Sequence, residues 1–215
     1  MSLTICHASD LHGNIRSLLA SDRMPDVFVL TGDIFPNESN YPVFDSEVRE
    51  QNYWFNDGVG DQLVKRFGNR PVITVSGNHD FVNLASMLRA RGVEAYDMEI
   101  GPVEILGERF AGFRSINWIE GRWQGEEHDL SPMVEKAFSQ DPTVLVTHAP
   151  PSGILDQDVG GHGYGIKVLT QALAYRPHRI KASLFGHSHH QGRNTCEEMG
   201  ILFSNAATGV NWLEV

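Results

Sequence analysis

The sequence predicts an α/β fold in which two mixed β-sheets pack together and are covered by helices. Apolar, β-prone runs alternate with segments of helical periodicity in both halves of the chain. Between these halves, the runs 103–106 and 109–113 flank Gly107-Glu108 and predict a β-hairpin. The chain has 215 residues, of which 41% are hydrophobic. That is enough for one large core, so we expect a single domain over residues 1–215.

The expected elements follow from local patterns. Short apolar runs predict strands at 3–6, 27–30, 72–75, 144–146, 184–185, 201–204 and 212–215. Apolar residues at helical spacing predict helices at 15–19, 44–67, 81–90, 133–138 and 164–175. Gly58 and Gly60 are expected to interrupt the second helix. Ser131 as N-cap and Pro132 at the first helical position are expected to begin the fourth, and Pro177 follows the fifth.

Five of the expected strands are followed directly by side chains that bind metal ions. In chain order these are Asp10 with His12, Asp33, Asn78-His79-Asp80, His148, and His187 with His189. In α/β folds the ligand crevice lies outside the carboxyl ends of the strands. We therefore expect the five stretches to converge on one site.

The donor types indicate which metal ions this site would hold. Asp10 and His12 are two residues apart, as are His187 and His189, and in extended chain such side chains share a face and can reach one ion. Asp33 is expected to bridge two cations through its two carboxylate oxygens. Nitrogen and oxygen donors without thiolate suit Mn, Fe or Zn rather than a structural zinc site. Two ions about 3.5–4 Å apart can activate a hydroxide for in-line displacement at phosphorus.

These motifs together resemble those of the calcineurin-like metallophosphoesterase family. The matching blocks are Asp10-x-His12-x-Asn14, Gly32-Asp33, Gly77-Asn78-His79-Asp80, His148 and Gly186-His187-x-His189. They occur in order and extend over almost the whole chain. The resemblance implies a four-layer α/β/β/α sandwich with two mixed sheets, and a hydrolase that uses two divalent metal ions per chain. We expect Mn²⁺, with Fe, Zn, Ni and Mg as alternatives.

The resemblance also implies a role for each site residue. One ion would be held by Asp10, His12, Asp33 and His189, and the other by Asp33, Asn78, His148 and His187. His79 would not be a ligand but would face the scissile phosphate, where it stabilises charge and protonates the leaving oxygen. Asp80 is expected to hold neighbouring site residues in position. The expected catalytic set is His79, Asp80 and Asp33. Asn78, His79 and Arg114 are expected to contact substrate.

Two details narrow the expected substrate. Residues 148–156 resemble a segment of a phosphodiesterase-like branch of the family. The Asp-Arg-Gly and Arg typical of Ser/Thr protein phosphatases are replaced by residues 34–37 and by Val75-Ser76. This departure disfavours the Ser/Thr protein phosphatase branch, and it leaves the orienting partner of His79 unidentified. We expect a small phosphodiester, such as a nucleotide derivative. The alternatives are a phosphomonoesterase or nuclease acting through the same site, and a binding module that keeps the scaffold without turnover.

Other residues are candidates for contact with the substrate. The aromatic residues after the second motif are Tyr41, Phe44, Tyr53, Trp54 and Phe55. Most are expected to pack in the core, but a flat ring can also stack on a nucleobase. Between the hairpin and the next helix, the candidates beside Arg114 are Asn117, Trp118 and Arg122.

Charge and composition limit the partners and the compartment. The chain has 17 basic and 27 acidic residues and a formal net charge of −10, which disfavours binding to duplex nucleic acid. We therefore expect a small phosphoester as partner, with neither nucleic acid nor a membrane. The first residues lack the pattern of a signal peptide, and no apolar run approaches the roughly 20 residues that span a bilayer. The expected location is cytoplasmic.

Overall fold

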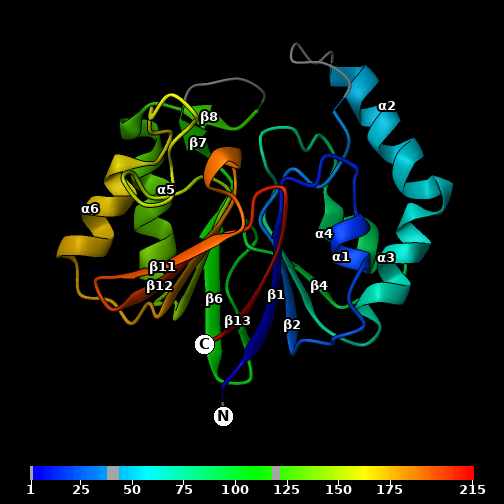
Figure 1. Cartoon of the computed structure of the whole chain (residues 1–215), viewed down its shortest axis with the longest axis horizontal. Helices are drawn as coiled ribbons and strands as arrows, with labels where there is room; N and C mark the ends of the chain where they lie inside the picture. The colour runs from blue at the N-terminus through cyan, green and yellow to red at the C-terminus, as the bar shows by residue number, and fades with distance from the viewer. Residues whose placement is uncertain (1, 38–43, 118–121) are drawn as a thin grey trace.

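The computed structural model describes residues 2–37, 44–117 and 122–215 (Figure 1). Two of the candidate aromatic residues, Tyr41 and Trp118, lie outside these residues. None of the helices in the described ranges is long and apolar enough to cross a membrane.

Two large mixed β-sheets form the centre of the molecule. The first sheet has the order β13-β1-β2-β3-β4 and the second β11-β12-β10-β9-β6-β5. The strands of the first sheet are β1 Thr4–Ser9, β2 Val27–Leu30, β3 Val72–Thr74, β4 Ala95–Asp97 and β13 Gly209–Glu214. Those of the second are β5 Val103–Ile105, β6 Glu108–Phe113, β9 Val144–Thr147, β10 Ala182–Phe185, β11 Asn194–Glu198 and β12 Ile201–Asn205. A small separate pair joins β7 Ile116–Asn117 to β8 Gln124–Gly125.

The central strands of each sheet are parallel, so their carboxyl ends lie at one edge. β1, β2 and β3 pair in parallel, with Ala8 opposite Leu30 and Leu30 opposite Thr74. In the second sheet, the four strands β6, β9, β10 and β12 are likewise parallel to one another. The strands that pair antiparallel, β13, β5 and β11, lie at the ends of the sheets. Parallel strands buried on both faces read as continuous apolar runs, which is why these strands could be recognised in the sequence.

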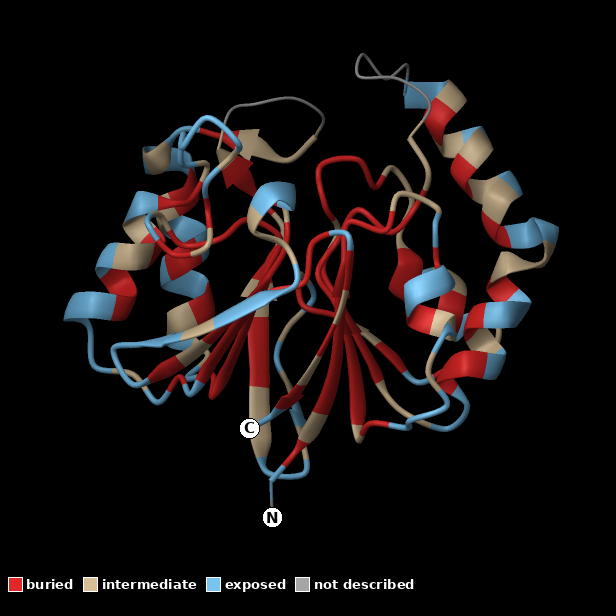
Figure 2. Cartoon of the chain, in the orientation of Figure 1, coloured by how far each residue is buried: buried red, intermediate tan, exposed pale blue. Residues whose placement is uncertain are grey.

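Helices cover the outer face of each sheet, which gives the predicted α/β/β/α order of layers (Figures 1 and 2). They are α1 Arg16–Leu19, α2 Phe44–Trp54, α3 Gly60–Phe67 and α4 Leu84–Arg89 beside the first sheet, and α5 Glu127–Ser139 and α6 Lys167–Tyr175 beside the second. A central core of Val29, Ile73, Val146, Leu184 and other side chains lies between the sheets. Two further cores pack α3 and α4 against the first sheet and α5 and α6 against the second.

The predicted interruption of the second helix is present. Between α2 and α3, the π-helical segment η1 (Phe55–Val59) contains non-helical backbone at Asp57 and Gly58, where φ is 89° at the glycine. The predicted hairpin is also present, with Leu106 and Gly107 in the turn, both at positive φ. Glu108, which was expected in this turn, belongs to β6 instead.

The predicted start of α5 was wrong. The helix begins at Glu127, and Pro132 lies inside it instead of at its first position. The beginning is fixed by a reciprocal capping box in which the Glu126 and Asp129 side chains each accept from the other's backbone N–H. Ser131 is therefore an interior residue of the helix and not its N-cap.

Two other helices begin three residues later than expected, each for a visible reason. α4 starts at Leu84, because the side chain of Asn83 caps it by accepting from Ser86 N at 2.8 Å. α6 starts at Lys167, where the carboxylate of Glu127 accepts from the N–H groups of Lys167 and Val168 at 3.0 and 2.9 Å. A long-range contact fixes this second start, and local sequence does not reveal it.

Gly112 is expected to be essential to the second sheet. It lies opposite Val146, and a Cβ at position 112 would come 1.7 Å from the Val146 carbonyl oxygen. Gly112→Ala should lower the free energy of unfolding by about 2–3 kcal/mol in urea titrations, because the strands must move apart. Gly101→Ala is the matched control, since nothing lies within 4 Å of its added Cβ, and should change stability by less than about 0.5 kcal/mol. Equal stability of the two variants would contradict this packing.

Candidate metal centre

The loops that follow β1, β2, β3, β9 and β10 meet at the edge opposite the chain termini (Figure 1). Residues 31–35 and 77–80 are all buried, and Figure 2 shows these loops as buried backbone. Loops normally lie on the surface, because their backbone polar groups need partners. Here side chains provide the partners, so the loops are held in fixed positions.

Glycines allow the loops after β2 and β3 to touch. Gly32 has φ of 95°, and a Cβ on it would lie 2.4 Å from Gly77 N. A Cβ on Gly77 would lie 2.1 Å from Oδ1 of Asp33. The Asp33 carboxylate can therefore rest against the backbone of the neighbouring loop only because residue 77 has no side chain.

Four of the predicted metal ligands have left-handed backbone. The φ values are 50° at Asp10, 44° at His12, 52° at Asp33 and 67° at His187. This conformation is uncommon for residues other than glycine, and strained residues gather at functional sites. These four residues all follow strand ends at the shared edge of the two sheets, so the uncommon backbone is concentrated where the candidate ligands lie.

The first group of candidate ligands consists of Asp10, His12 and His189, whose ligand atoms lie within 4.8 Å of one another. His189 Nε2 is 3.1 Å from Asp10 Oδ1 and 3.4 Å from His12 Nε2. The other oxygen, Asp10 Oδ2, accepts from Ser9 Oγ and from the backbone N–H of His187. These two bonds orient the carboxylate so that Oδ1 faces the histidines.

The second group consists of Asp10, Asp33 and His148, again within 4.8 Å. His148 Nδ1 lies 2.7 Å from the carbonyl oxygen of Thr31, which can only accept, so Nδ1 carries the proton. In the neutral ring Nε2 is then an acceptor, yet it lies 2.9 Å from Asn78 Oδ1 and 3.4 Å from Asp33 Oδ2.

Both groups bring electron-pair donors together in a way that calls for a cation. When the His148 ring is neutral, three acceptors converge at its Nε2, whereas a protonated ring donates there instead. At His189, two imidazole nitrogens face each other beside a carboxylate. His12 Nδ1 is buried without a hydrogen bond in the described residues. The donors are oxygens and imidazole nitrogens, which fits borderline divalent ions. The residues present therefore fit the two ions that the sequence predicts.

The ionisation of these groups shows the same need for positive charge. Burial opposes ionisation of Asp10 and Asp33, but His189 and His148 respectively outweigh it and lower the pKa of each carboxyl. Burial would also lower the pKa of His148, but the Asp33 carboxylate outweighs this and raises it to about 10. The fold thus keeps two carboxylates ionised in its interior and balances them with positive charge from imidazole groups.

His187 lies beside this cluster. Its ring centroid is 5.1 Å from that of His148, and burial lowers its pKa to about 4, which keeps the ring neutral and able to bind a metal. Asp10 is the carboxylate common to both groups, whereas the bridging role was predicted for Asp33. The bridging role of Asp33, and the division of ligands between the ions, remain predictions.

The backbone of His79 is fixed by hydrogen bonds at both its N–H and its carbonyl. Its N–H donates to Asp33 Oδ1 at 2.7 Å, and its carbonyl accepts from Gln51 Nε2 at 2.6 Å. The side chain is buried, its ring centroid is 5.6 Å from that of His12, and Nδ1 has no hydrogen-bond partner in the described residues. The ring of His79 therefore lies beside the His12 ring, and its expected contact with the scissile phosphate stays a prediction.

Asp80 joins the loops after β2 and β3. Its carboxylate accepts from the backbone N–H groups of Asp33, Ile34, Phe35 and Gly77, at 2.8 to 3.3 Å. Burial and the charge of Asp33 raise the pKa of Asp80 to about 7, against the lowering effect of the Gly77 and Phe35 N–H groups and of His148. Asp80 thereby holds the two loops together, and its role in catalysis stays a prediction.

Gln51 is a site residue that the sequence analysis missed. This fully buried side chain on α2 donates to the carbonyls of His79 and Pro36 and accepts from Phe81 N at 2.8 Å. It fixes the backbone of His79, whereas no hydrogen bond to ring Nδ1 of His79 is found in the described residues. A signal was present, because Gln51 falls between Val48 and Phe55 on the apolar stripe of the helix, where a polar side chain needs buried partners.

Two of the substrate-side candidates, Arg114 and Arg122, are held by aromatic rings. Arg114 Nε pairs with Glu99 at 3.2 Å, and its guanidinium stacks on Trp123, so its predicted contact with substrate stays a prediction. Arg122 stacks on Phe44 and Trp123 and donates its backbone N–H to Asn78 O at 2.8 Å.

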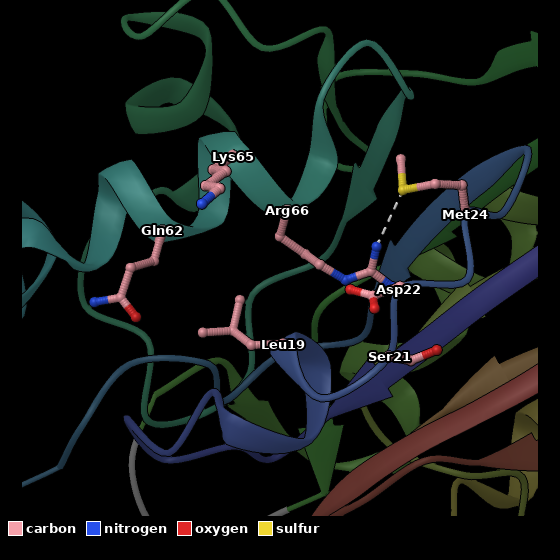
Figure 3. A pocket seen from close by; sticks show the side chains of 7 residues that line it. All are labelled: Leu19, Ser21, Asp22, Met24, Gln62, Lys65 and Arg66. Atoms are coloured by element: carbon pink, nitrogen blue, oxygen red, sulfur yellow. Dashed lines mark hydrogen bonds between the residues drawn. The ribbon is translucent and has the colours of Figure 1, made fainter.

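A separate cavity of about 430 Å³ lies between α3 and the segment after α1 (Figure 3). The guanidinium of Arg66 borders it but donates to the carbonyls of Leu18 and Arg23 and contacts Met24 Sδ. This cavity shares no lining residue with the clustered ligands, so it is not part of the candidate metal centre.

Comparison with known proteins agrees with this geometry. Residues 3–191 match the family model of the calcineurin-like phosphoesterases, and the chain belongs to this family. The match includes every clustered ligand, from Asp10 to His189. Members of the family are metal-dependent phosphoesterases that use two metal ions. No curated protein matches the chain significantly.

Gln51 is expected to control the position of His79. Gln51→Ala should lower kcat by about 10–100-fold while the metal content stays that of the wild type, because the ligands are untouched. Asn52→Ala is the matched control on the same helix, since the Asn52 side chain donates to Val48 O within α2 itself. Kinetics on a phosphodiester and metal analysis would be measured well below the unfolding temperature. A Gln51→Ala variant with wild-type kcat would show that His79 needs no such support.

Proposed function

We propose that this protein is a two-metal phosphoesterase that hydrolyses a small phosphodiester, such as a nucleotide derivative. The observation that carries the proposal is the convergence of Asp10, Asp33, His148 and His189 from four strand ends on one edge of the sheets. The phosphodiester preference is supported by residues 148–156, which resemble the phosphodiesterase-like branch. The net charge of −10 supports a small substrate rather than a nucleic acid.

The residues divide into two sets of ligands under this proposal. Asp10, His12, Asp33 and His189 would hold one ion, and Asp33, Asn78, His148 and His187 the other. Mn²⁺ is our first candidate, because the donors are carboxylate, amide and imidazole. When bound, two such ions provide a nucleophilic water at neutral pH and neutralise charge on the phosphate oxygens.

His79 carries the proton chemistry of the proposed reaction. Hydrogen bonds on both sides of its backbone fix where the ring stands, and the ring borders His12 rather than open solvent. From there the imidazole would donate a proton to the leaving oxygen. Asp80 assists indirectly, because it fixes the loops that carry Asp33 and His79.

Turnover with simple substrates tests the proposal directly. The protein supplied with Mn²⁺ should hydrolyse bis-p-nitrophenyl phosphate, and a chelator should abolish the reaction. The diester should be hydrolysed faster than p-nitrophenyl phosphate, the monoester control. The absence of turnover with Mn, Fe, Zn, Ni and Mg would favour a binding module. Faster hydrolysis of the monoester would instead favour a phosphomonoesterase.

The role of His79 is tested by its removal. His79→Ala should bind both ions like the wild type yet lower kcat by about 10²–10⁴-fold, because the general acid is lost while the ligands remain. His128→Ala is the control, since the His128 side chain is 81% exposed on α5. Metal analysis and steady-state kinetics provide both readouts. Unchanged kcat in His79→Ala would remove this histidine from the mechanism.

A further inference from the structure

A cavity of about 600 Å³ opens beside the candidate metal centre. Its lining includes His12, Asn14 and Arg16 from the chain after β1, Pro36 from the chain after β2, and Trp54 from the end of α2. Because His12 belongs to both sites, the cavity continues directly from the clustered ligands. Its volume lies within the range of about 300–1,000 Å³ that is usual for small-molecule sites.

The aromatic wall of this cavity is fixed in place. Trp54 is half-buried, and its ring packs edge-on against the fully buried Phe35, with centroids 5.5 Å apart and planes at 70°. The helix that carries it is tied to the site by Gln51, which donates to Pro36 O. A rigid, half-buried indole at the mouth of a cavity is a platform on which a flat ring can stack.

The same cavity holds the positive charge of Arg16, for which the described residues provide no counter-charge. Arg16 is exposed, and its guanidinium forms no ion pair or hydrogen bond with the described residues. Arg114, Arg176 and Arg179 are each paired with a carboxylate. Guanidinium groups bind phosphate in a planar, two-pronged geometry, so an unpaired arginine beside a phosphate-processing site suits a second anionic group.

We propose that this cavity is the subsite for the part of the substrate beyond the scissile phosphate, and that it takes a nucleoside carrying an additional phosphate. The base stacks on Trp54 and the additional phosphate pairs with Arg16. The inference rests on the proposed function, because the metal centre binds the scissile phosphate next to His12. It narrows the substrate class to nucleotides with more than one phosphate group.

Calorimetric binding of three probes tests the subsite without turnover. Protein loaded with Mn²⁺ and freed of excess ion is titrated with ribose 5-phosphate, AMP and ADP. The expected order of affinity is ADP, then AMP, then ribose 5-phosphate. Trp54→Leu should weaken AMP and ADP by roughly 5–100-fold and leave ribose 5-phosphate unchanged, because one stacked base contributes about 1–3 kcal/mol. Trp54→Phe, which keeps a ring on Phe35, should recover part of the loss.

The arginine is tested separately with a variant that leaves the core intact. Arg16→Gln should abolish the advantage of ADP over AMP while AMP binding stays close to wild type. Tyr53→Leu and Arg49→Gln are matched controls on α2, since both side chains are exposed and neither lines the cavity. Equal affinity of the wild type for AMP and ribose 5-phosphate would overturn the subsite, as would equal effects of Arg16→Gln on ADP and AMP.

The outcomes also separate this inference from the proposed function. If the protein binds the probes in the expected order but hydrolyses no phosphodiester, the subsite is supported and the proposed activity is contradicted. If the protein hydrolyses bis-p-nitrophenyl phosphate but does not distinguish AMP from ribose 5-phosphate, the activity is supported and the subsite is contradicted.

Discussion

The negative charge of Asp10 and Asp33, buried where the two sheets meet, is the constraint on which the rest of the site depends. An ionised carboxylate in a protein interior is costly unless positive charge and hydrogen bonds compensate it. The compensating positive charge comes from two imidazoles that follow strands of the opposite sheet, His148 and His189. It also aims backbone N–H groups at both carboxylates. Metal ions meet the same requirement more strongly than protonated imidazole, so one constraint explains both the strained strand ends and the chemistry that we propose.

The supporting side chains extend this constraint outward. Asp80 ties together the loops after β2 and β3, and Gln51 connects those loops to α2. The helix end that Gln51 holds also carries Trp54, the wall of the proposed nucleotide subsite. Metal centre, His79 and subsite are therefore positioned by one continuous set of hydrogen bonds.

The features predictable from sequence were those that depend on local pattern. Central strands such as β2 and β9 could be recognised because burial on both faces leaves continuous apolar runs. The ligand cluster was predictable because each polar motif directly follows such a strand. Features set by distant contacts were not. β11 is polar and mostly exposed, α6 begins where Glu127 reaches across to it, and Gln51 acts on loops about thirty residues further along the chain.

The central claim is that two ions bind where these loops meet, and anomalous diffraction tests it most directly. Crystals soaked in Mn²⁺ should show two anomalous peaks. One should contact Asp10, His12 and His189, the other Asn78 and His148, with Asp33 between them. A single peak, or density away from these side chains, would contradict the account.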